Sequence, residues 1–101
     1  QGSWVWDSVL AKLPKDSRIH PIAIDLPGNG TNQSVAAKDV TLQTYLDFIE
    51  TVIRKEQQEV HHHGNNNNNI NKVSLVGHSG GGQIMTAAAD CFAGFIESLV
   101  Y

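Results

Sequence analysis

The sequence has a single cysteine, few charged residues and no long apolar run, and each shortage excludes a class of protein. One cysteine, Cys91, cannot form an intramolecular disulfide. No apolar stretch approaches the roughly 20 residues of a bilayer-spanning helix, so we expect no membrane span. Seven lysines and arginines against ten aspartates and glutamates give a net charge of −3. Without a basic excess, we expect no electrostatic binding of nucleic acid.

What is present is typical of a globular protein. Hydrophobic residues make up 41% of the 101 residues, which is too apolar for a chain disordered throughout. This length allows at most one domain. No charged-then-apolar leader opens the sequence, and together with the single cysteine this favours the cytosol without deciding the compartment.

Apolar spacing predicts three helices and three strands in alternation. The predicted helices are 4–13, 42–58, with Thr41 as its N-cap, and the small-residue stretch around 84–92. The predicted strands are 20–24, 73–76 and 95–101. Such alternation predicts an α/β fold in which helical crossovers join parallel strands.

Residues 60–71 interrupt the pattern with three histidines and a run of asparagines. This low-complexity stretch cannot bury apolar surface, so we predict an insertion loop within the domain. It contains no acidic residue or cysteine to complete a metal site, and we expect none there.

The segment from Gly77 to Gly81 carries the chemistry, because it matches the Gly-x-Ser-x-Gly pattern of a nucleophile elbow. In that motif a strand turns sharply into a helix with the serine, here Ser79, at the apex. Side chains at Gly77 and Gly81 would collide across the turn, so both are predicted to shape it. The amide of Gly80, at a helix N-terminus, is the predicted oxyanion donor.

Two other interpretations of this glycine-rich segment fit the sequence less well. It could be a loop with an incidental serine, although an apolar strand before it and a small-residue helix after it favour the elbow. A phosphate-binding loop is excluded, because neither the Walker lysine pattern nor G-x-G-x-x-G is present.

Several segments resemble the α/β-hydrolase superfamily. "VSLVGHSGGG" (73–82) resembles its nucleophile elbow, and "IDLPGNG" (24–30) resembles a turn after an earlier strand, with Asn29 in place of a frequent histidine. "GSWVWDSVLAKL" and "IESLVY" are similar to the helix after the oxyanion loop and the strand after the nucleophile helix. The Gly-x-Trp-x-Trp opening leans towards esterases, methyl esterases and hydroxynitrile lyases.

The resemblance implies that residues 1–101 are the central part of an α/β-hydrolase domain. It makes Ser79 the nucleophile and puts the triad acid and histidine beyond Tyr101. It also puts the second oxyanion donor upstream of this chain. A strand upstream of Gln1 would lie between strands 20–24 and 73–76, so only the last two predicted strands would pair directly.

The implied function is carboxylic-ester hydrolysis through an acyl-enzyme on Ser79, with a small-molecule ester as substrate and no cofactor or metal. Two alternatives stay open: a non-catalytic remnant or interaction module on the hydrolase scaffold, and a hydroxynitrile-lyase-like activity. The activity of the 101 residues alone, the substrate and the oligomeric state stay undecided.

The remaining candidates have mainly structural explanations. His78 and Trp4 are possible pocket residues, although one-sided burial of a helix would explain Trp4. His78 is disfavoured as the base, because adjacent side chains at such a turn point apart. Asp25 is predicted to accept backbone amides of neighbouring loops. Asp90 lies too far along its helix to orient a base at Ser79, and Cys91 is predicted to pack in a buried helix.

Overall fold

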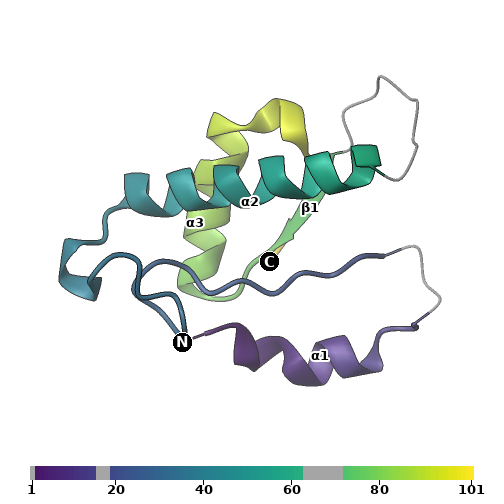
Figure 1. The fold of residues 1–101 in the computed structure, drawn as a ribbon, viewed down its shortest axis with the longest axis horizontal. Helices are drawn as coiled ribbons and strands as arrows, with labels where there is room; N and C mark the ends of the chain where they lie inside the picture. Colours follow the sequence, from purple (N-terminus) through teal and green to yellow (C-terminus); the bar gives the residue numbers. More distant parts are fainter. Residues whose placement is uncertain (1, 16–18, 63–71) are drawn as a thin grey trace. The chain divides into compact units, whose positions relative to one another are not determined.

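A computed structural model describes residues 2–15, 19–62 and 72–101 (Figure 1). The chain divides into two compact units, Gln1–Val40 and Thr41–Tyr101, and each is described by itself. Helices labelled η are 3₁₀-helices. The elements are η1 (Ser3–Trp6), α1 (Asp7–Lys12), η2 (Ala37–Asp39), α2 (Leu42–His62), β1 (Val73–Val76), α3 (Gly80–Cys91), η3 (Ala93–Phe95) and β2 (Ile96–Val100).

The second unit contains a parallel strand pair, β1 and β2, with α3 as the crossover between them. Val76 is aligned with Val100, and the Gly77 N–H donates to the Val100 carbonyl at 2.9 Å, just past the end of β1. This confirms that the last two predicted strands pair directly. It also confirms the α/β class with a helical crossover.

The strand predicted over 20–24 is wrong: residues 19–26 have no regular secondary structure, and Figure 1 draws them as a plain trace. A strand exists through its hydrogen-bond ladder with a neighbour. In the described part of the chain no segment forms such a ladder with residues 20–24. The described fold therefore has two strands, not three, alongside its three α-helices.

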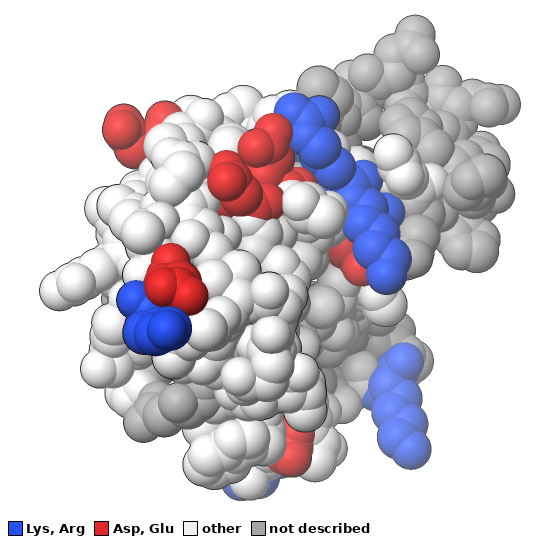
Figure 2. Space-filling model, turned by 60° about the vertical axis from the view of Figure 1, so that its left-hand side comes forward, with Lys and Arg blue, Asp and Glu red and all other residues white. Residues whose placement is uncertain are grey.

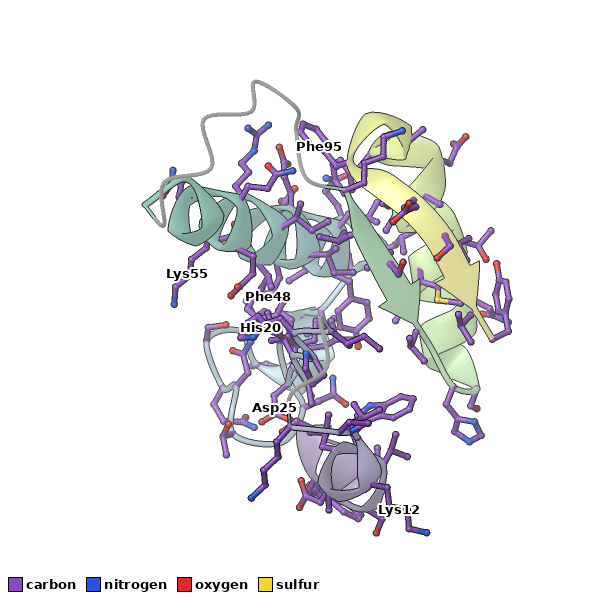
Figure 3. The ribbon with its side chains drawn as sticks, turned by 90° about the vertical axis from the view of Figure 1, so that its right-hand side faces the viewer. Lys12, His20, Asp25, Phe48, Lys55 and Phe95 are labelled. Carbon is purple, nitrogen blue, oxygen red and sulfur yellow. The ribbon has the colours of Figure 1, made fainter. Side chains whose placement is uncertain are left out.

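The core of the second unit lies where α2 packs on α3. The buried apolar side chains are Leu46, Ile49 and Ile53 of α2, and Met85 and Ala88 of α3. Steps of three and four residues place each set on one face of its helix. Next to this core, Arg54 of α2 lies 5.7 Å from the centre of the ring of Phe95, which belongs to η3 and is labelled in Figure 3. The middle of the apolar stripe that predicts helix 42–58 is thus buried, whereas Leu42 at its start is 53% exposed.

The N-terminus of α2 begins with the predicted cap. Thr41 Oγ1 accepts the Thr44 N–H at 3.2 Å, and Thr44 Oγ1 accepts the Thr41 N–H at 3.1 Å. This reciprocal pairing has the form of a capping box with threonine at the third position. At its other end α2 reaches His62, inside the stretch predicted as an insertion. Residues 63–71 lie outside the described residues, so the loop stays a prediction.

The first unit is organised around the carboxylate of Asp25, labelled in Figure 3. Its Oδ1 accepts the Ser3 N–H at 2.5 Å, and its Oδ2 accepts the Thr31 N–H at 3.1 Å and the Thr31 hydroxyl at 2.7 Å. Gly30 has a φ of +53°, and a Cβ there would lie 2.6 Å from Asp25 Cγ. The predicted structural role of Asp25 is confirmed.

The helix predicted over 4–13 forms as a 3₁₀ turn followed by α1, but no residue of η1 or α1 is buried. Trp4 is 65% exposed, so one-sided burial does not explain it. Cys91 is also exposed, contrary to the packing role predicted for it, because it lies on the outer side of the last turn of α3.

The surface of the described chain is sparsely charged, and most of the face in Figure 2 is neither acidic nor basic. Among the described helices, none combines the length and the apolar character needed to cross a bilayer.

We expect Asp25 to titrate far below an ordinary aspartate. The hydrogen bonds from Ser3 and then Thr31 lower the pKa of its carboxyl from 3.8 to about 2, because they favour the charged form. The carboxylate therefore adds stability above about pH 4, and this contribution is lost as the pH falls through about 2. Carboxyl chemical shifts followed by NMR against pH measure this pKa.

Two variants sharpen the test. Thr31→Val removes the hydroxyl donor and is expected to bring the pKa of Asp25 back towards 3.8. Asp25→Asn is expected to lower the stability of the first unit at neutral pH, with the difference from wild type shrinking between about pH 4 and 2. An Asp25 carboxyl that titrates near 3.8 in the wild type contradicts the predicted network.

Candidate functional site

Ser79 lies in the turn between β1 and α3, at the carboxyl end of β1. Its backbone has φ 57° and ψ −125°, and no other non-glycine residue of the described chain has a positive φ. Such a conformation costs an L-residue roughly 1–3 kcal/mol and persists only when its surroundings hold it. The strained apex that the motif predicts is therefore present at Ser79.

The strand side of this turn is tightly packed at Gly77. A Cβ on Gly77 would lie 2.9 Å from the carbonyl carbon and oxygen of Gly81, and 2.9 Å from Met85 Sδ. No side chain fits between these backbones. At Gly81 the predicted collision is absent, because a Cβ there would meet nothing within 4 Å. Glycine is therefore sterically required at position 77, before the serine, and not at position 81, after it.

The first turn of α3 leaves one backbone amide available beside Ser79. The Gly81 N–H donates to the His78 carbonyl at 3.0 Å, and the Gly82 N–H donates to the Ser79 carbonyl at 2.9 Å. The Gly80 N–H makes no hydrogen bond to the described residues. It lies at the positive end of a twelve-residue helix, where the backbone favours a negative charge.

The Ser79 side chain is exposed, and no described residue hydrogen-bonds to its hydroxyl. His78 is exposed as well and forms no hydrogen bond with the serine. Asp90 lies in the last turn of α3, about 15 Å from the start of that helix at 1.5 Å per residue. The described part of the second unit therefore brings neither an acid nor a base to Ser79. Trp4, which the sequence offers as a possible pocket residue, belongs to the first unit and not to the unit of Ser79.

A match over the whole chain decides the family. The model of the "Alpha/beta hydrolase family" covers residues 1–101. The chain belongs to this family.

Two curated plant proteins of Arabidopsis thaliana are similar to this hydrolase-family chain. One, named "Putative methylesterase 12, chloroplastic", is 30% identical over 104 aligned residues, and the other, named "Putative methylesterase 14, chloroplastic", is 29% identical over 104. Each alignment covers 99% of this chain and 25% of the relative. The chain thus spans about a quarter of the length of these relatives. No solved structure matches it.

Sequence reasoning missed a contact between Tyr101 and the start of α3. A Cβ on Gly82 would lie 3.1 Å from Cδ1 of the Tyr101 ring, so the ring lies directly on this glycine. The Tyr101 hydroxyl also hydrogen-bonds to Thr86 Oγ1. One available signal was the third consecutive glycine, which lies outside the Gly-x-Ser-x-Gly pattern of the hydrolase family.

The two glycines that flank Ser79 are expected to respond in opposite ways to the same substitution. Gly77→Ala forces a methyl group against the Gly81 backbone and is expected to destabilise the fold by about 1–3 kcal/mol. Gly81→Ala adds a methyl group into open space within a helix and is expected to stabilise it by about 0.5–1 kcal/mol.

Denaturant unfolding of both variants beside the wild type measures the difference. Because the same methyl group is added four residues apart, each variant is the control for the other. Equal destabilisation by the two substitutions contradicts the one-sided packing of this turn.

Proposed function

We propose that this chain carries the nucleophile elbow of an esterase-like serine hydrolase that acts on small-molecule carboxylic esters. The observation that supports this best is the turn at Ser79. An exposed serine hydroxyl at a strained backbone position lies next to an unused amide at a helix N-terminus. Acyl transfer needs this combination of an accessible nucleophile and a donor for the developing oxyanion.

In the proposed reaction, Ser79 Oγ attacks the ester carbonyl carbon and its proton passes to a general base. The carbonyl oxygen becomes an oxyanion, which the Gly80 N–H stabilises by donating a hydrogen bond. The bond to the alcohol oxygen then breaks, and the alcohol leaves with the proton. Water hydrolyses the acyl-Ser79 ester by the same steps in reverse, releasing the acid and regenerating the hydroxyl.

The general base and its acid are proposed to come from outside these 101 residues. No histidine follows Ser79 in the sequence, whereas the hydrolase motif has its acid and histidine after the serine. The relatives are about four times as long as the matched region, so they have room for both groups. The second oxyanion donor is proposed to lie upstream, as the resemblance to the α/β-hydrolase family implies.

Methyl esters are the substrate class that we propose testing first, because the names of both similar plant proteins include methylesterase. A methyl ester has a small alcohol part, so the acyl side would determine which substrates bind. This assignment is finer than the family and rests on relatives at about 30% identity.

We expect a fluorophosphonate probe to label the full-length protein at Ser79. Ser79→Ala is expected to abolish labelling and to lower ester turnover by up to about 10⁶-fold, since removal of a nucleophilic serine has effects of this size. Ser8→Ala, at an exposed serine on α1, is the matched control and is expected to label normally. Labelling that persists in Ser79→Ala excludes this serine as the nucleophile.

The 101-residue chain by itself is expected to hydrolyse p-nitrophenyl acetate no faster than background. Ser79 alone, without a base, is a weak nucleophile near neutral pH. Initial rates of the isolated chain are compared with those of its Ser79→Ala variant. Turnover that disappears in the variant would show that the chain contains its own base.

A further inference from the structure

The backbone of Ser79 is held from both sides of its turn. On the strand side, the Gly77 N–H donates to the Val100 carbonyl at 2.9 Å. On the helix side, the Gly82 N–H donates to the carbonyl of Ser79 itself at 2.9 Å. Gly82 therefore connects the first turn of α3 to the backbone of the strained serine through a hydrogen bond.

Gly82 is buried, and the residue that covers it is Tyr101, which directly follows β2. A Cβ on Gly82 would lie 3.1 Å from Cδ1 and 3.5 Å from Cε1 of the ring. A side chain at this position would require the ring to move away from α3 by a few tenths of an ångström. The outer part of the ring stays open to solvent, since Tyr101 is 74% exposed overall.

The hydroxyl groups of Tyr101 and Thr86 add a short chain of hydrogen bonds to this contact. Thr86 Oγ1 lies 2.9 Å from the Gly82 carbonyl and donates its hydrogen to it. A hydroxyl has one hydrogen to donate, so in its bond with Thr86 the Tyr101 hydroxyl is the donor. The Tyr101 ring thus lies on the side of Gly82 where a Cβ would point. Thr86 donates to the Gly82 carbonyl, and the Gly82 N–H donates to the Ser79 carbonyl.

We propose that Tyr101 is a positioning residue for Ser79. It fixes the first turn of α3 through Gly82 and Thr86, and thereby the backbone angle of the serine and the direction of the Gly80 N–H. This role rests on the proposed function of Ser79, because it concerns how that nucleophile is aimed. The tether, meaning the contact of Tyr101 with Gly82, can be tested without any substrate through the exchange rate of the Gly82 amide.

The kinetic test uses Tyr101→Ala and Tyr101→Phe in the full-length protein, with a p-nitrophenyl ester as substrate. Loss of the ring is expected to lower kcat by about tenfold or more with KM within about twofold, because a small displacement of a nucleophile slows chemistry more than binding. Tyr101→Phe keeps the ring and loses the hydrogen bond to Thr86, and its kcat is expected to lie between those of wild type and Tyr101→Ala.

Leu99→Ala is the matched control, because this half-buried residue of β2 lies two positions before Tyr101 and is not among the neighbours of a Cβ on Gly82. It is expected to lower stability while leaving kcat within about twofold of wild type. If Leu99→Ala and Tyr101→Ala lower kcat equally at equal loss of stability, Tyr101 has only a packing role. The proposal is also overturned if Tyr101→Ala leaves kcat unchanged.

Hydrogen exchange separates this proposal from the function on which it rests. The Gly82 amide is expected to exchange about tenfold faster in Tyr101→Ala than in wild type, whether or not Ser79 is the nucleophile. An unchanged Gly82 exchange rate overturns the tether. Failure of Ser79-dependent probe labelling in the wild type would instead overturn the proposed function, with the faster exchange still observed.

Discussion

The parallel pairing of β1 and β2 is the constraint on which the second unit depends. Two parallel strands cannot be joined by a hairpin, so the chain must return along the sheet by a crossover of about a dozen residues or more. Here the crossover is α3, followed by η3, and it begins directly after β1. The chain has only the few residues around Ser79 in which to turn from strand to helix.

This sharp turn accounts for the properties that make Ser79 a candidate nucleophile. The strand and helix backbones approach so closely that no side chain fits at Gly77, and the serine takes a left-handed conformation at the apex. The hydroxyl is left in solvent, and the Gly80 amide begins a helix with no earlier turn to accept its hydrogen. Strain at the serine is balanced by the ladder of β2 and by the helix–helix core.

The first unit is held together in a different way. Its helical residues are not buried, and its tightest organisation is a set of hydrogen bonds converging on the carboxylate of Asp25. A charged acceptor of this kind favours short contacts with backbone amides, and the absence of a side chain at Gly30 makes room for it. The second unit is therefore held together by an apolar core, and the first unit by hydrogen bonds to a carboxylate.

The sequence alone determined the elements that form because of a periodic apolar pattern or of interactions between neighbouring residues. The stripe of α2, its Thr41 cap, the strand before Ser79 and the strand after α3 were all predictable, because spacing and turn chemistry are written in neighbouring residues. The family could be predicted as well, because several segments, including the one around Ser79, resemble the α/β-hydrolase superfamily. The same reasoning identified Asp25 as a structural acceptor.

Only the tertiary structure decided the features that depend on distant partners. Residues 20–24 have the composition of a strand but no ladder in the described chain, because pairing is a property of two segments. Glycine is sterically required at Gly77 and not at Gly81, which follows from which backbone lies opposite. The contact of Tyr101 with Gly82 joins residues nineteen apart in sequence. The third consecutive glycine is a local signal for one side of this contact, but no local pattern identifies Tyr101 as its partner.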